Sequence, residues 1–138
     1  MTRVIIVDDN ENFRKGLKAV LNNMEQTEII GEASNGKEFL DILSKSEADL
    51  VFMDVKMPIV DGIQATIAAK SAYPKLIIYA FSSFENEEYK KSMMEAGANG
   101  YLCKSQDNYE MLNNIIKKQN INENERFIKT TKNYSHGN

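Results

Sequence analysis

The chain is poor in the residues that bind soft metals or form cross-links. Its 138 residues include one cysteine, Cys103, one histidine, His136, and no tryptophan. A single cysteine excludes a disulfide within the chain and a metal cluster held by several thiolates. A single histidine near the end of a polar segment argues against histidine-dependent catalysis and against a zinc site with several histidine ligands. The scarcity of cysteine fits a reducing cytoplasm, where we expect the protein to reside.

Long apolar runs and an excess of basic charge are lacking as well. The first apolar run, Val4–Val7, is too short for a signal peptide, and no run approaches the roughly 20 residues of a membrane span. We therefore expect no membrane association. The net charge of −3 argues against direct nucleic-acid binding by this chain, because nucleic-acid-binding domains usually carry a basic face. The length and the 42% hydrophobic content predict one globular domain.

Short apolar runs alternate along the chain with segments of helical periodicity. This alternation predicts an α/β fold, a parallel sheet with helices on both of its faces. The last helix is expected from Asp107 to about residue 119, and it closes a domain that spans residues 1–119. Residues 120–138 are rich in Asn, Glu, Lys and Thr, which predicts a polar, flexible carboxyl-terminal tail. The runs predict strands at residues 4–7, 29–33, 50–54, 76–81 and 100–103.

The stretch around the third apolar run organises the rest of the chain. Leu50–Met53 are apolar without a break, as in a strand that is buried on both faces. Asp54 ends the run at the carboxyl end of the strand, where open α/β sheets place their sites. Pro58 turns the chain, and Asp61 is a suitable N-cap for the next helix. On its own, Asp54 would be better explained as a helix cap than as a functional residue.

Polar residues follow four of the predicted strands. Asp8 and Asp9 follow the first, Asp54 the third, Ser82 the fourth and Lys104 the fifth. Each alone could be a turn, a cap or a solvated charge, but the carboxyl ends of parallel strands meet at one edge of a sheet. Together they would form an acidic cluster that attracts a hard divalent cation such as Mg²⁺. One carboxylate could then act as a nucleophile toward a phosphoryl group.

Four motifs combine these residues with their neighbours in sequence. They are the acidic pair at 8–9, the run D-V-K-M-P-I-V-D-G at 54–62, Ser82, and the run G-A-N-G-Y-L-C-K at 97–104. Together they resemble the receiver domain of bacterial two-component response regulators, over residues 3 to about 119. The resemblance implies a flavodoxin-like (βα)5 fold, a doubly wound parallel five-stranded sheet in the order 2-1-3-4-5. It also implies a signalling switch that phosphorylates and dephosphorylates itself, and not an enzyme.

The resemblance implies a role for each site residue. Asp54 accepts a phosphoryl group from a histidine kinase or phosphotransfer protein, in a reaction that depends on Mg²⁺ or Mn²⁺. Ser82 and Lys104 contact the phosphoryl group, and Ser82 and Tyr101 form the conformational switch. Ordinary half-buried packing of Tyr101 remains an alternative. The implied metal ligands are Asp8, Asp9, Asp54 and the backbone carbonyl of Lys56.

The family resemblance also implies how the signal leaves the domain. Receivers usually act through the surface of their fourth helix, fifth strand and fifth helix, which a partner or an output domain recognises. A homodimer through the same surface is a further expectation. Many receivers precede a DNA-binding domain, for which residues 120–138 are too few. A longer parent protein could carry such a domain.

Two positions depart from the family pattern or modify it. Ser105 stands where a proline is usual, which leaves the shape of the loop before the last helix open. We expect Phe84 to shield the acyl phosphate from water, so that Phe84→Ala would speed the loss of phosphate.

Three other functions fit the residues less well. A phosphorylation-independent binding module would not need the full set of polar residues. A phosphohydrolase with an aspartyl nucleophile needs an acid two residues later, where Lys56 stands. A flavin-binding protein needs a neutral phosphate loop, whereas Asp8–Glu11 is acidic.

Overall fold

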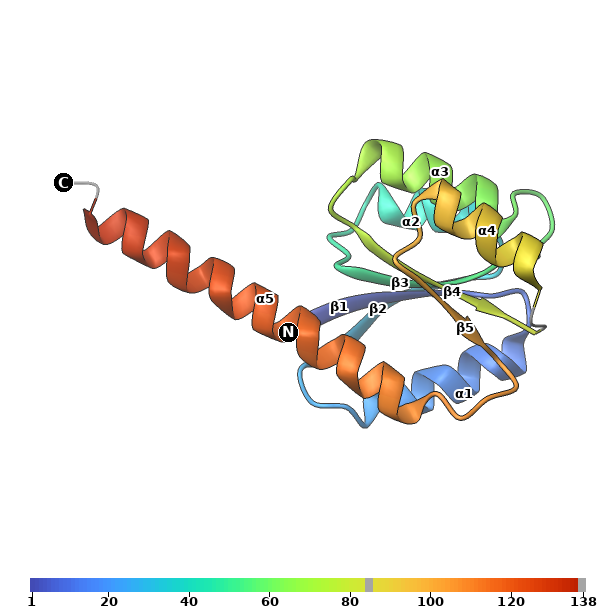
Figure 1. Ribbon diagram of the computed structural model, residues 1–138, viewed down its shortest axis with the longest axis horizontal. Coiled ribbons are helices and arrows are strands. Elements are labelled where there is room, and N and C mark those ends of the chain that lie inside the picture. The colour runs from blue at the N-terminus through green and yellow to red at the C-terminus, as the bar shows by residue number, and fades with distance from the viewer. Residues whose placement is uncertain (84–85, 137–138) are drawn as a thin grey trace.

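Five parallel strands form one sheet, with helices on both faces (Figure 1). A computed structural model describes residues 1–83 and 86–136, with side chains placed as far as residue 125. The strand order β2-β1-β3-β4-β5 confirms the flavodoxin-like prediction. The elements are β1 (Thr2–Val7), α1 (Glu11–Asn22), β2 (Thr27–Ala33), α2 (Gly36–Leu43), β3 (Leu50–Asp54), α3 (Gly62–Ala72), β4 (Ile77–Ser82), α4 (Glu87–Ala96), β5 (Gly100–Cys103) and α5 (Tyr109–His136).

The sheet separates two apolar layers. Helices α2, α3 and α4 cover one face, and α1 and α5 cover the other (Figure 1). The first layer includes Phe39 and Met53, and the second includes Leu21, Phe52 and Ile116. All residues of β3 are buried, as expected for a central strand that is covered on both faces. In the described part of the chain, no helix has the length and apolar character to cross a membrane.

Side-chain caps start helices α1 to α4 just after the carboxyl ends of the strands. The capping oxygens belong to Asn10, Asn35, Asp61 and Asn86, each of which accepts a hydrogen bond from the first turn of its helix. Asp61 is thus the predicted N-cap, and it forms a capping box with Gln64. These caps place the amino ends of the helices along the edge of the sheet where β1 and β3 end.

Helix α5 is longer than the sequence predicts. The polar composition predicted a tail without regular structure from residue 120, but the helix continues to His136. Asn120 is buried, and its side-chain oxygen accepts a hydrogen bond of 3.0 Å from Thr2 Oγ1. The amino group of Met1 forms an ion pair of 2.7 Å with Glu123. These contacts with the start of β1 extend the helix past its predicted end. The domain boundary at residue 119 stays a prediction, and the last two residues lie outside the described ones.

Candidate functional site

Three carboxylates meet at the carboxyl edge of the sheet. Asp8 and Asp9 directly follow β1, and Asp54 is the last residue of β3, the strand next to β1. Each offers an oxygen within 4.8 Å of an oxygen of the other two. Asp8 is 1% exposed and Asp54 6% exposed, whereas Asp9 is exposed to solvent. Parallel topology alone predicted that these residues would converge, and the structure brings them together.

Lys104 contacts this cluster through its ammonium group. It is the one lysine among the described residues that forms ion pairs with these carboxylates. Its Nζ lies 2.6 Å from Asp8 Oδ2 and 3.4 Å from Asp54 Oδ1. Its side chain is only 12% exposed, so both ion pairs are largely shielded from water. Three carboxylates and one ammonium leave the cluster with a formal charge of −2.

Burial beside a second carboxylate perturbs the titration of Asp54. Burial, together with repulsion from Asp8, raises the pKa of Asp54 to about 7, although Lys104 opposes the shift. Near neutral pH the metal-free site therefore retains a proton on Asp54 more readily than an exposed aspartate would. A second positive charge beside Asp54 would release this proton and leave the carboxylate free to act as a nucleophile.

The donor set fits a hard divalent cation. Asp8 Oδ1 accepts a hydrogen bond of 2.8 Å from the backbone N–H of Asn10. Asp8 Oδ2 is buried, accepts no hydrogen bond of good geometry among the described residues, and lies 2.6 Å from the Lys104 ammonium. Carboxylate oxygens with free lone pairs are the ligands that Mg²⁺ prefers. The residues present thus fit Mg²⁺, whereas a ligand role for the Lys56 carbonyl stays a prediction.

A pocket of about 150 Å³ opens onto the cluster. Ser82 ends β4 and is buried, and its carbonyl accepts a hydrogen bond of 2.8 Å from the backbone N–H of Lys104. The topology thus brings the predicted serine and lysine to the same pocket as Asp54. The residues that line this pocket are Asp9, Asn10, Asp54, Lys56, Ser82, Ser83, Tyr89 and Lys104.

Of the two aromatic residues that the sequence analysis assigned a role, Tyr101 lies within the described part of the chain and Phe84 does not. Tyr101 is half-buried on β5, opposite Ala80 of β4, and packs against the apolar layer under α2 to α4. Its part in a switch stays a prediction. Phe84, the expected shield of the phosphoryl group, lies outside the described residues.

Two other aromatic rings lie beside the cations of the site, and sequence reasoning missed both contacts. The Nζ of Lys56 lies 5.2 Å from the ring centroid of Tyr89, and hydrogen bonding with Tyr89 raises the pKa of Lys56. The Nζ of Lys104 lies 4.4 Å from the ring centroid of Phe13. Phe13 lies four residues before Leu17 and eight before Leu21, a helical spacing typical of an inward-facing side chain, but this spacing does not indicate a contact with Lys104. No local signal predicts the place of Tyr89, because it depends on how α4 packs.

The loop before α5 is ordered without the usual proline. The side-chain amide of Asn108 donates hydrogen bonds to the carbonyls of Cys103, at 2.8 Å, and Gln106, at 3.1 Å. The hydroxyl of Ser105 lies 3.1 Å from Cys103 Sγ. These contacts fix the conformation of the loop that carries Lys104. The loop therefore has a defined shape with Ser105 in place of the usual proline.

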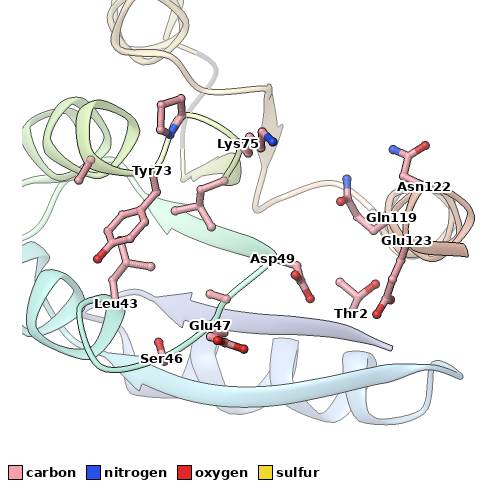
Figure 2. Close-up of a pocket in the computed structure, with 14 residues that line it drawn as sticks. Thr2, Leu43, Ser46, Glu47, Asp49, Tyr73, Lys75, Gln119, Asn122 and Glu123 are labelled. Atoms are coloured by element: carbon pink, nitrogen blue, oxygen red, sulfur yellow. The ribbon is translucent and has the colours of Figure 1, made fainter. Parts of the chain in front are cut away.

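A larger pocket, of about 550 Å³, lies at the opposite edge of the sheet (Figure 2). It also contains carboxylates, but three of them already form ion pairs with cationic groups. Arg3 pairs with Glu47 at 3.0 Å and with Asp49 at 3.8 Å, and the amino group of Met1 pairs with Glu123 at 2.7 Å. Three carboxylates that converge within 4.8 Å of one another therefore mark the smaller pocket, and not the larger one, as the candidate site.

Comparisons with known proteins find relatives that match most of the chain. A family model described as the response regulator receiver domain matches residues 4–116. The chemotaxis protein CheY of Halobacterium salinarum is 40% identical over 102 residues, which cover 74% of this chain and 83% of that protein. The transcriptional regulatory protein DegU of Brevibacillus brevis is 30% identical over 105 residues, which cover 76% of this chain and 44% of that protein. The chain thus spans about half the length of regulators of the DegU kind.

A similar fold occurs among solved structures. The crystal structure of a LuxR-family two-component response regulator from an Aurantimonas species superimposes with a TM-score of 0.79 and 27% identity. The match covers 86% of each chain. The signal receiver domain of the putative response regulator NarL from Mycobacterium tuberculosis has the same TM-score of 0.79, at 24% identity.

Proposed function

The chain belongs to the response regulator receiver domains, a family of signalling switches, and we propose that it accepts a phosphoryl group on Asp54. The donor is the phosphohistidine of a histidine kinase or of a phosphotransfer protein. The observation that carries the proposal is the Asp8, Asp9 and Asp54 cluster with the Lys104 ammonium between two of its members. The resident metal is Mg²⁺ or Mn²⁺, held by the three carboxylates and the carbonyl of Lys56.

The transfer step forms one bond at Asp54 and breaks one in the donor. A carboxylate oxygen of Asp54 attacks phosphorus, the P–N bond of the phosphohistidine breaks, and its electron pair returns to the imidazole ring. Only the ionised carboxylate can attack, and burial works against ionisation at neutral pH. When bound, the metal ion supplies positive charge that favours ionised Asp54 and stabilises the phosphoryl oxygens.

Lys104 and Ser82 assist from the two neighbouring strands. The Lys104 ammonium, 3.4 Å from Asp54 Oδ1, is placed to stabilise negative charge on the transferring group. Ser82 lines the same pocket, where its hydroxyl can donate a hydrogen bond to a phosphoryl oxygen. Neither role needs a large rearrangement of the main chain, because Ser82 at the end of β4 and Lys104 directly after β5 already line the pocket.

The output of the switch passes through helix α4, strand β5 and helix α5. Ser82 and Tyr101 lie on the adjacent strands β4 and β5, so a movement of the hydroxyl toward phosphate can be coupled to the ring. The surface would then act on a partner protein, on a second copy of the chain or on an output domain of a longer parent. The proposed location is the cytoplasm.

Intact-protein mass spectrometry tests the proposal directly. The protein is incubated with Mg²⁺ and acetyl phosphate, beside Asp54→Asn and a sample with chelator. Asp49→Asn is the matched control, because Asp49 directly precedes the same strand but lies at the opposite edge of the sheet. We expect one added phosphoryl group in the wild type and in Asp49→Asn, and none in Asp54→Asn or without metal.

Two results would contradict the proposal. A phosphoryl group that is still gained by Asp54→Asn would place the acceptor elsewhere. Failure of the folded wild type to react with acetyl phosphate and with a panel of phosphorylated kinases would favour a phosphorylation-independent binding module.

A further inference from the structure

Lys104 stands between two hollows of the molecule. On one side it lines the pocket of about 150 Å³ that holds Asp54. On the other side it lines a groove of about 380 Å³ between helices α1 and α5. The groove has free space, since a Cβ added at Gly16 would have no heavy atom within 4 Å. A flexible lysine side chain at this wall needs something to keep its ammonium on the carboxylate side.

The ring of Phe13 is placed to do so. Phe13 belongs to α1 and lines the groove, and its ring centroid is 4.4 Å from Lys104 Nζ. This distance lies within the roughly 6 Å range of a cation–π interaction. Such interactions are strongest where water is excluded, and the Lys104 side chain is only 12% exposed.

The core fixes the ring itself. Phe13 meets Phe81 edge to face, with ring centroids 5.3 Å apart and an interplanar angle of 63°. Phe81 is 2% exposed and contacts Phe52 of β3 at a centroid distance of 5.7 Å. The backbone N–H of Phe13 also donates a hydrogen bond of 3.1 Å to the N-cap residue Asn10. Phe13 is therefore a rigid support for Lys104, because both its backbone and its ring are held.

We propose that Phe13 is a positioning residue that holds the Lys104 ammonium against Asp8 and Asp54 by a cation–π contact. The inference rests on the proposed function, in which Lys104 assists phosphoryl transfer. A leucine at position 13 would keep apolar packing in place but would offer no aromatic face, so Lys104 could turn toward the groove. The ion pair with Asp8, at 2.6 Å, would still favour the carboxylate side, so Lys104 would leave its position in only part of the molecules.

Three variants separate positioning from packing. Phe13→Leu removes the aromatic face, and Phe13→Tyr keeps it. Phe52→Leu is the matched control, because it removes another ring that packs on Phe81, and the described residues show no cation–π contact between that ring and Lys104. Each variant is first checked for folding by circular dichroism, and its rates are expressed per folded molecule.

The first readout is the rate of phosphorylation by acetyl phosphate at saturating Mg²⁺, as a function of donor concentration. Phe13→Leu should lower the maximal rate by about 3- to 10-fold, in line with the loss of a partly desolvated cation–π contact. The donor concentration for half-maximal rate should change little. Phe13→Tyr and the control Phe52→Leu should both show the maximal rate of the wild type.

The second readout is the chemical shift of the Lys104 ε-methylene protons, assigned with the help of Lys104→Arg. The face of an aromatic ring moves nearby protons upfield, so these signals should be upfield in the wild type and Phe13→Tyr. They should return to ordinary lysine values in Phe13→Leu. This readout does not require phosphorylation.

The outcomes distinguish the inference from the function on which it rests. If the wild type is phosphorylated and Phe13→Leu reacts equally fast, or if Phe52→Leu slows the reaction as much, the inference is overturned. If the wild type takes up no phosphoryl group, the proposed function fails, and the Lys104 signals alone decide. Ordinary lysine shifts in the wild type would then overturn the positioning role.

Discussion

The buried carboxyl group of Asp54 makes the stability of the metal-free protein depend on pH. Asp54 is 6% exposed, and burial raises its pKa from an ordinary value of 3.8 to about 7. Between these two values the folded protein keeps a proton that the unfolded chain has released. The free energy of unfolding therefore falls as the pH rises through this window, and the loss is complete above the folded pKa. Asp54→Asn removes the titrating group and should remove this slope.

The size of the effect follows from the shift. About three pKa units correspond to about 4 kcal/mol at most. We expect roughly half of this, because Lys104 lies 3.4 Å away and the pocket admits water, both of which reduce the penalty for the ionised form. Between about pH 5 and about pH 8, the wild type should lose about 1–2 kcal/mol of stability relative to Asp54→Asn.

Urea unfolding followed by far-ultraviolet circular dichroism measures this difference, since the chain has no tryptophan for a fluorescence assay. Both proteins are unfolded with a chelator present, and the contribution of His136, which they share, cancels. Added Mg²⁺ should then flatten the wild-type slope and stabilise that protein by about 2.7 kcal/mol at 100 times its dissociation constant. Asp54→Asn should gain less. Parallel pH profiles for the two proteins would refute the reasoning, because they would show that Asp54 is ionised in the folded state without a penalty.

Three further substitutions test the loops and ends that support the site, each by urea unfolding. Gly62→Ala should lose about 3 kcal/mol or more, since a Cβ at Gly62 would clash with the carbonyl oxygen of Asp54; a loss below about 1 kcal/mol would contradict the close approach. Ile59→Asn should gain about 1 kcal/mol, because the β-branched Ile59 has a φ of 70°, which asparagine tolerates better; a loss of stability would show that the exposed side chain is needed. Asn120→Ala should cost about 1–2 kcal/mol through its buried hydrogen bond with Thr2, and an unchanged midpoint would mean that α5 is not attached there.

The central part of the site could be predicted from sequence because strand topology determines it. A run of apolar residues that ends in Asp54, and others that end in Asp8 or Lys104, places these groups at one edge once the strands are parallel. The register of β3 between β1 and β4 then sets them side by side. No knowledge of helix packing is needed for this step.

The surroundings of the same groups could not be predicted, because they depend on how helices pack on the sheet. Phe13 follows the helical spacing of a core residue, and that spacing is also satisfied when the ring touches no charge. Tyr89 meets Lys56 only because α4 lies over the loop after β3. The residues of each pair, Phe13 with Lys104 and Tyr89 with Lys56, lie far apart in the sequence. No local sequence pattern can therefore indicate their contact.

The end of α5 shows how a few polar contacts can override composition. Asn and Glu are abundant after residue 119, and such a segment predicts a solvated chain. Helical geometry, however, places Asn120 one turn beyond Ile116, on the face that Ile116 buries against the sheet. At that position a polar side chain stabilises the fold, because the hydroxyl of Thr2, at the amino end of β1, donates a hydrogen bond to it. A larger apolar residue at position 120 would leave the Thr2 hydroxyl without its acceptor, so the polar pair extends the helix where apolar content alone would have ended it.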